Sequence, residues 1–298
     1  MGDQIIMFIS QIFNGLKIGS VYSLVALGYT MVYGILKLIN FAHGDLFMLS
    51  GIMMIYLAAS FPTMPMWVTI LIMIALTVFV GFAIEKCAYS PLRTAPRMSV
   101  MISAIGVSYL LQNLVCYVTG GLAKQFPDIP LISQSVRVFG VKDKLAVFIS
   151  PLVAVVLMVI LVLIINHTKF GMSMRAVSKD FETAQLMGVK INRVISMTFI
   201  IGSFLAAVGA LLYFAKNTGI NHMAGSTPGI KAFIAAVVGG IGSVPGAVVG
   251  ALLIGVVESL AKAFGLADFS DVISFALLII ILVIKPTGLF GEKTTEKV

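Results

Sequence analysis

The sequence predicts an all-α, polytopic integral membrane helix bundle, and three observations carry that prediction. Hydrophobic residues make up 59% of the 298 positions, charged residues only 11%, and the mean hydropathy is +1.08. A water-soluble domain of this length could not cover its surface with so few polar residues. The apolar runs are long and unbroken, which excludes the alternating ten-residue strands of an outer-membrane barrel. We expect one transmembrane domain over 1–298.

Hydropathy divides the chain into about eight or nine transmembrane segments. The predicted spans are 8–37, 41–60, 66–86, 98–118, 146–166, 192–215, 244–265 and 270–286. A Gly-rich segment, 229–242, precedes the last two spans and is short for a membrane helix. A segment that re-enters the membrane is the alternative there.

Positive charge predicts the orientation. Three basic clusters fall on one side of these spans: Lys86, Arg93 and Arg97; Lys169, Arg175, Lys179, Lys190 and Arg193; Lys285, Lys293 and Lys297. The positive-inside rule makes that side cytoplasmic, so the N-terminus is expected outside and the C-terminus inside. The opposing loop 120–144 carries four basic residues, which makes the bias modest. Because the basic residues lie near span ends, the net charge of +8 does not indicate nucleic acid.

One face of the first span is more polar than contact with lipid requires. Small and hydroxyl residues recur there at helical spacing: Gly19, Ser23, Ala26, Thr30 and Tyr33. Such residues are typical of helix packing in membranes, and the lining of a passage is the alternative.

Three polar residues, Asn40, His43 and Asp45, follow at the expected cytoplasmic turn. Polar groups at membrane depth are functional candidates. The alternative is that Asn40 or Asp45 caps the second helix while His43 bonds to the backbone.

Two carboxylates, Glu85 and Glu258, lie closest to span interiors. Each is near a span end, where it can reach interfacial water or the neighbouring Lys86 and Lys262. This placement argues against a buried proton relay.

The polar segment 167–190 predicts a helix in a water-facing loop. Good helix formers run from Met174 to Gly188, a residue suited to a helix C-terminus. Residues spaced by four would form one ridge of mostly small side chains: Ala176, Asp180, Ala184 and Gly188. Charged residues flank that ridge: Arg175, Lys179 and Glu182. The ridge would let another surface approach closely, and a solvated amphipathic helix is the alternative.

Glycines recur in the region before the last spans: Gly239, Gly240, Gly242, Gly246 and Gly250. The spacing of four lets helix backbones approach closely. Pro245 fits the first turn of a helix, so a new helix should begin near Ser243 as N-cap, after a break. Free N–H groups at that break would favour an anionic group of a solute, and close packing alone is the alternative.

No motif indicates catalysis by this chain. The string 288–294 lacks the glycine spacing of a phosphate-binding loop and has no strand before it. Cys87 and Cys116 lie on different spans, and the three histidines are too scattered for a metal site. We therefore expect no metal or cofactor, and a protein that moves a solute.

Three stretches resemble branched-chain amino acid permeases of the LivH type, over nearly the whole of 14–291. Glu182-Thr183-Ala184 with Gly188 resembles E-A-A-x-x-x-G, the loop through which permeases of ABC importers dock onto their ATPases; Thr183 replaces the first alanine. The N-terminal signature is matched by NG-x-x-x-GS-x-YSL-x-ALG, TMVYG and INFAHGD, which ends at Asp45. The region from Pro228 matches as P-x-GIKAF-x-AAV-x-GGIGS-x-PGA. We call 167–190 the coupling loop.

The resemblance implies a permease subunit of an ATP-driven importer for leucine, isoleucine and valine in the cell inner membrane. It implies as partners a paralogous LivM-type permease in a heterodimer, two cytoplasmic ATPases, an extracytoplasmic binding protein and membrane lipid, but no nucleic acid. The coupling residues would be Arg175, Ala176, Asp180, Glu182, Ala184 and Gly188. Related permeases for urea or short amides share the motifs. An ion-coupled secondary transporter and a membrane scaffold are alternatives of other classes.

Overall fold

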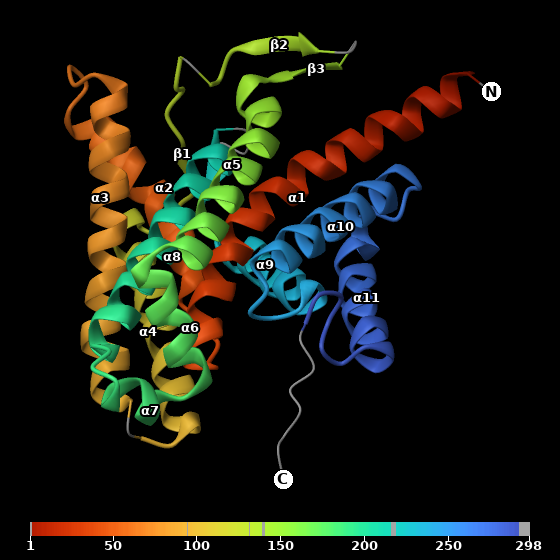
Figure 1. The fold of residues 1–298 in the computed structure, drawn as a ribbon. Helices are drawn as coiled ribbons and strands as arrows, with labels where there is room; N and C mark the ends of the chain where they lie inside the picture. The colour runs from red at the N-terminus through yellow and green to blue at the C-terminus, as the bar shows by residue number, and fades with distance from the viewer. Residues whose placement is uncertain (1, 94, 131, 139–140, 216–218, 292–298) are drawn as a thin grey trace.

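The computed structural model describes residues 2–93, 95–130, 132–138, 141–215 and 219–291. Within them the chain folds into a bundle of helices with two small β-pairings at one end (Figure 1). Eight of the helical segments are long and apolar enough to cross a membrane, which confirms the predicted fold class. The expected tail residues Lys293 and Lys297, and the end of the string 288–294, lie outside the described residues.

The long helices begin and end close to the predicted span boundaries. They are α1 (Gly2–Leu36), α2 (His43–Ser60), α3 (Met66–Ile84), α4 (Arg97–Thr119), α5 (Leu145–His167), α8 (Ile191–Phe214), α10 (Val244–Ala263) and α11 (Ser270–Ile284). A π-helical turn, Glu85–Tyr89, and a 3₁₀ turn, Ser90–Leu92, extend α3. Another 3₁₀ turn, Ala267–Phe269, leads into α11.

Short elements join the long helices. The coupling loop contains α6 (Lys169–Lys179) and α7 (Phe181–Leu186), and α9 (Ser226–Gly239) precedes α10. Strands β2 (Ser135–Val138) and β3 (Val141–Lys144) form an antiparallel hairpin, and β1 (Lys124–Gln125) pairs antiparallel with β4 (Gly219–Ile220). Figure 1 places α7 at the opposite end of the bundle from the β2–β3 hairpin.

Helix α1 is the centre of the bundle. It packs against α10, α8, α9 and α5, and 83% of the most apolar window of its span is buried, compared with 11% for α11 at the periphery. Gly15 and Gly19 allow the contact with α10, because a Cβ at either position would meet backbone atoms of that helix. The peripheral helices expose their apolar side chains, which suits lipid.

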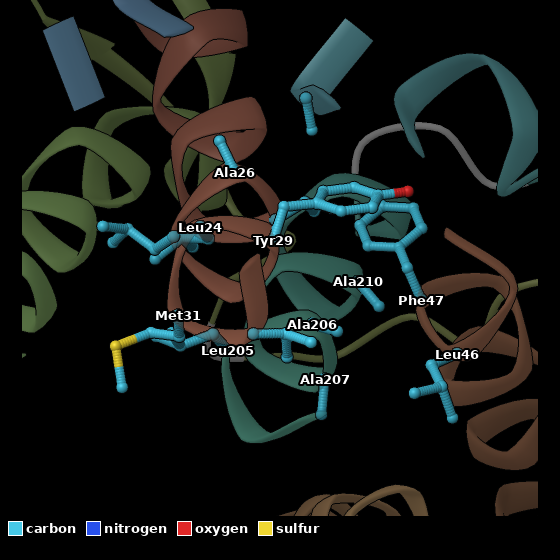
Figure 2. Close-up of a cluster of buried hydrophobic side chains, with 14 of the residues drawn as sticks. Leu24, Ala26, Tyr29, Met31, Leu46, Phe47, Leu205, Ala206, Ala207 and Ala210 are labelled. Atoms are coloured by element: carbon cyan, nitrogen blue, oxygen red, sulfur yellow. The ribbon is translucent and has the colours of Figure 1, made fainter. Parts of the chain in front are cut away.

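The core between α1, α2 and α8 combines large and small side chains. Phe47 of α2 is fully buried against Phe214 of α8, with ring centroids 5.1 Å apart. Figure 2 shows three alanines of α8, Ala206, Ala207 and Ala210, in the same cluster as large side chains of α1 and α2. Small residues on α8 let the helices approach, as is usual where no hydrophobic effect drives helices together in lipid.

Helix α9 is shorter than the eight candidate membrane spans. Its 14 residues extend about 21 Å, less than the roughly 30 Å of a bilayer core. Its C-terminal end lies against the segment after α11, since Leu289 N donates to Val238 O and Phe290 N donates to Gly239 O, both at 2.9 Å. Helix α9 also packs against α10, which follows it directly, so the two helices form a hairpin with one short arm.

The new helix begins after Ser243, as predicted. The Ser243 hydroxyl caps α10 by accepting a hydrogen bond from Gly246 N at 3.2 Å, and Pro245 lies in the first turn.

Candidate functional site

Helix α2 begins with buried side chains, after a turn in which Lys37 and Phe41 are exposed. Lys37, with φ +55°, ends α1, and residues 37–42 lead without helical structure to His43. The His43 ring packs against Gly28, where a Cβ would clash with it, and lies edge-on to Tyr29 at 4.8 Å between ring centroids. Asn40, His43 and Asp45 are only 2%, 1% and 3% exposed. The three residues lie at the α1–α2 turn with buried side chains, and the side of the membrane that this turn faces stays a prediction.

The side chains of Asn40 and Asp45 do not cap α2. Its N-cap position is held by Ala42, and no side chain makes a capping hydrogen bond there. Asn40 Oδ1 instead accepts from the hydroxyl of Tyr89 at 2.8 Å. Both side chains were available for capping, but burial next to α3 and α4 gave them partners on other helices.

Asp45 reaches the middle of α4. Its Oδ2 accepts a hydrogen bond from the Ser108 hydroxyl at 2.5 Å, and its Oδ1 accepts one from Gln112 Nε2 at 3.0 Å. Both partners are neutral, and no cationic side chain lies within ion-pair distance of Asp45 among the described residues.

A cavity of about 180 Å³ lies beside this carboxylate. Its polar wall is formed by Asp45, Ser108 and Gln112. The N-terminal end of α9, where no side chain caps the helix, forms a second wall with Gly225, Ser226 and Gly229. The remaining lining is Tyr29, Ile39, Phe41, Gly44, Ile230 and Phe233. The cavity thus combines a carboxylate, a helix N-terminus with its partial positive charge, and apolar side chains.

The polar face of α1 is mainly a packing face. Gly19 packs on α10, and the Ser23 hydroxyl donates to Ser20 O at 2.7 Å within α1. The buried Thr30 hydroxyl has no hydrogen-bond partner among the described residues. Tyr33 borders a smaller void of about 10 Å³, shared with Tyr29. Of the residues predicted to form this face, only Tyr33 comes near the 180 Å³ cavity, through the smaller void that it shares with Tyr29.

The glycines before α10 serve packing and turning. A Cβ on Gly239, Gly246 or Gly250 would run into backbone atoms of the facing arm of the α9–α10 hairpin. Gly240 and Gly242 have φ of +106° and +98°, which favours glycine in the connecting turn. The break before Ser243 does not line the cavity, and its Ser243 cap uses an N–H group that we expected to face a solute.

An ionic network holds α9 in place. The ammonium of Lys231 lies 3.0 Å from Glu258 of α10 and 2.8 Å from Asp271 of α11. Glu258 also accepts from Lys262 at 2.6 Å and from the Tyr22 hydroxyl at 3.1 Å. Glu258 is buried and pairs with Lys262, which is one of the two alternatives expected for it.

A second network joins α3 to α8. Glu85, fully buried, accepts from Arg93 and from the Ser196 hydroxyl, the latter at 2.8 Å, and lies 3.4 Å from Lys86. Arg93 also donates to Asn192 in the first turn of α8. The coupling loop leads directly into that turn.

The coupling loop is not one helix from Met174 to Gly188, as we expected. It breaks at Asp180, whose carboxylate accepts from the backbone N–H groups of Glu182 and Thr183 and, at 2.5 Å, from the Thr183 hydroxyl. The hydroxyl bond, and then the amide bonds, hold the pKa of Asp180 below its ordinary value. Aspartate caps a new helix better than it continues an old one.

The break abolishes the predicted ridge. Ala184 is only 4% exposed, so it packs against the chain itself. Ala176 is half-buried, Glu182 is exposed, and Arg175 donates to Ile165 O at the end of α5. Gly188, with φ +84°, ends α7 in a Schellman motif: its N–H donates to Gln185 O, and Val189 N donates to Ala184 O. The exposed apolar tip consists of Leu186 and Met187, 88% and 81% exposed.

Several residues of the cavity and the networks were missed from the sequence. Ser108 and Gln112 are four apart on one face of an otherwise apolar span, a signal that could have marked them. Lys231 stands within an apolar helix, where a charge indicates a buried partner. Tyr29 and Ser226 carried no such signal.

Comparison with known proteins places this arrangement in a family. The family model for the permease component of branched-chain amino acid transport systems matches residues 11–282. The permease protein LivH of a high-affinity branched-chain amino acid transport system, from Salmonella typhimurium, is 38% identical over 100% of both chains. BraD of Pseudomonas aeruginosa, with the same description, is 40% identical over 98% of both. These relatives are transport components and not enzymes. The chain therefore belongs to the family of branched-chain amino acid transport system permeases, and is a multi-pass inner-membrane protein.

Proposed function

We propose that this chain is the permease subunit of an ATP-driven importer for leucine, isoleucine and valine. The observation that carries the proposal is the identity of 38–40% over essentially the full length of LivH and BraD. The cavity supports it, because a carboxylate, a helix N-terminus and apolar walls together suit a zwitterion with an aliphatic side chain.

The proposed assembly contains four kinds of protein. A paralogous LivM-type permease supplies the other half of the passage, two cytoplasmic ATPases supply the energy, and an extracytoplasmic binding protein delivers the solute. The apolar tip of the coupling loop, Leu186 and Met187, fits the role of ATPase contact because it is exposed and apolar outside the membrane spans.

Side-chain contacts suggest how movement of the coupling loop reaches the cavity. The loop leads into α8, whose Asn192 is tied through Arg93 to Glu85 at the end of α3. Tyr89, in the same π-helical turn as Glu85, bonds to Asn40 in the segment that leads into α2. Displacement of the loop by the ATPases would therefore shift one wall of the cavity and favour one of two bundle arrangements.

Reconstitution tests the function. We expect vesicles with this chain, its partner permease, the ATPases and the binding protein to accumulate leucine only when ATP is hydrolysed. The measurement is uptake of radiolabelled leucine with and without ATP, and with an ATPase variant that cannot hydrolyse it. Uptake driven by an ion gradient without ATP would make the chain a secondary transporter. ATP-driven uptake of urea or short amides in place of leucine would reassign the substrate.

The proposed orientation puts the coupling loop in the cytoplasm and the β2–β3 hairpin outside. Ser178 belongs to α6, which leads into α7, and Ser135 belongs to β2; Figure 1 shows α7 and β2 at opposite ends of the bundle. In a chain lacking Cys87 and Cys116, we expect a membrane-impermeant thiol reagent on right-side-out vesicles to label Ser135→Cys and to spare Ser178→Cys. Permeabilising the vesicles should allow the reagent to label both cysteines. Labelling of Ser178→Cys alone from outside would invert the topology.

A further inference from the structure

The buried carboxylates of this protein are not alike. Glu85 has Arg93 and Lys86 as cationic partners, and Glu258 has Lys231 and Lys262. Asp45 is equally buried, yet its hydrogen-bond partners Ser108 and Gln112 are neutral, and no cation pairs with it in the part of the chain that the structure describes. A buried carboxylate without a counter-charge is costly, so a cationic group from outside the chain would stabilise its ionised form.

Asp45 is also the carboxylate that lines the cavity. The N-terminus of α9 packs on Gly44, next to Asp45, and lines the same cavity with Gly225 and Ser226. The positive end of the helix dipole favours an anionic group there, whereas Ser226 N and Gly229 N already donate to Met223 O and Gly225 O, and Pro228 has no N–H. Ile230 and Phe233, one and two turns further along α9, add apolar surface to the same cavity.

We infer that Asp45 binds the ammonium group of the transported amino acid, with the solute carboxylate at the N-terminus of α9 and its aliphatic side chain against Ile230 and Phe233. Ser108 and Gln112 hold the Asp45 carboxylate in position. The inference rests on the proposed function, since it requires the solute to be an amino acid.

Protection of a cysteine in the cavity tests this assignment. Ser226 is half-buried in the lining, so Ser226→Cys, in a chain lacking Cys87 and Cys116, reports on access to the cavity. In the complete reconstituted importer, we expect leucine to slow the reaction of this thiol with N-ethylmaleimide. The analogue 4-methylpentanoate, which lacks only the ammonium group, should not slow it.

Asp45→Asn should raise the half-protecting leucine concentration by about tenfold or more, because it removes a charged partner of the solute. Asp45→Glu keeps the charge and should raise the half-protecting leucine concentration less than Asp45→Asn does. Asp268→Asn makes the same change at an exposed carboxylate far from the cavity lining and should leave protection unchanged. If Asp45→Asn fails to assemble, the comparison of leucine with 4-methylpentanoate in the Ser226→Cys chain still tests whether protection requires the ammonium group.

Equal protection by both solutes, or unchanged protection in Asp45→Asn, would overturn the role of Asp45. Lack of protection by leucine in an importer that takes up leucine with ATP would overturn the location of the site while leaving the proposed function intact. Failure of the importer to take up any branched-chain amino acid would instead refute the proposed function.

Discussion

Replacing Leu186 and Met187 together by glutamate should abolish both copurification of the ATPases and ATP-driven transport. The two side chains are almost fully exposed at the tip of the coupling loop, so the isolated chain loses little packing when they change. Burying each in a partner is worth about 1.5–3 kcal/mol, which for the pair is roughly 10²-fold to 10⁴-fold in affinity. Glutamate adds a desolvation cost at the same place.

The matched control is Leu122→Glu, which makes the same change at an exposed leucine after α4, near the β1 strand at the other end of the bundle. We expect this variant to retain the ATPases. Ala184 is not a suitable position, because it is buried and an arginine there would disturb the loop itself. Normal copurification of the Leu186→Glu, Met187→Glu chain would show that the tip is a passive part of the loop.

Gly250→Val should prevent the α9–α10 hairpin from forming. A Cβ at this position would lie 2.8 Å from Gly239 N and 3.0 Å from its Cα, and these are backbone atoms that cannot rotate away. Overpacking in a well-packed core costs about 1–3 kcal/mol and more where backbone must move. Because α9 forms one wall of the cavity, we expect a lower melting temperature in detergent, low membrane abundance and loss of uptake by the protein that remains.

Gly106→Ala is the control for this substitution. Gly106 lies within α4, and a Cβ there would meet nothing within 4 Å. Alanine is the better helix former by about 1 kcal/mol, so the melting temperature should stay equal or rise. A Gly250→Val chain that melts like its parent would mean that the two helices are not in backbone contact.

The sequence alone was sufficient for the spans and for one helix start. Span positions follow from runs of apolar residues whose length must match the bilayer, and this requirement acts within each segment. The start of α10 followed from Ser243 and Pro245, whose capping chemistry is also local. The helix break in the coupling loop was not predicted, because good helix formers lie on both sides of Asp180 and favour one continuous helix. In the structure Asp180 caps a second helix.

The cavity was decided only by tertiary structure. Asp45 meets Ser108 and Gln112 across more than sixty positions of sequence, and Gly225 and Ser226 come from a third, distant segment. Local sequence patterns left two roles open for Asp45, because a carboxylate near a helix start can either cap the helix or act as a functional polar group at membrane depth. The role of Asp45 depends on which helices surround its side chain inside the bundle. That arrangement results from the packing of α1, α2, α4 and α9, which no single segment of sequence determines.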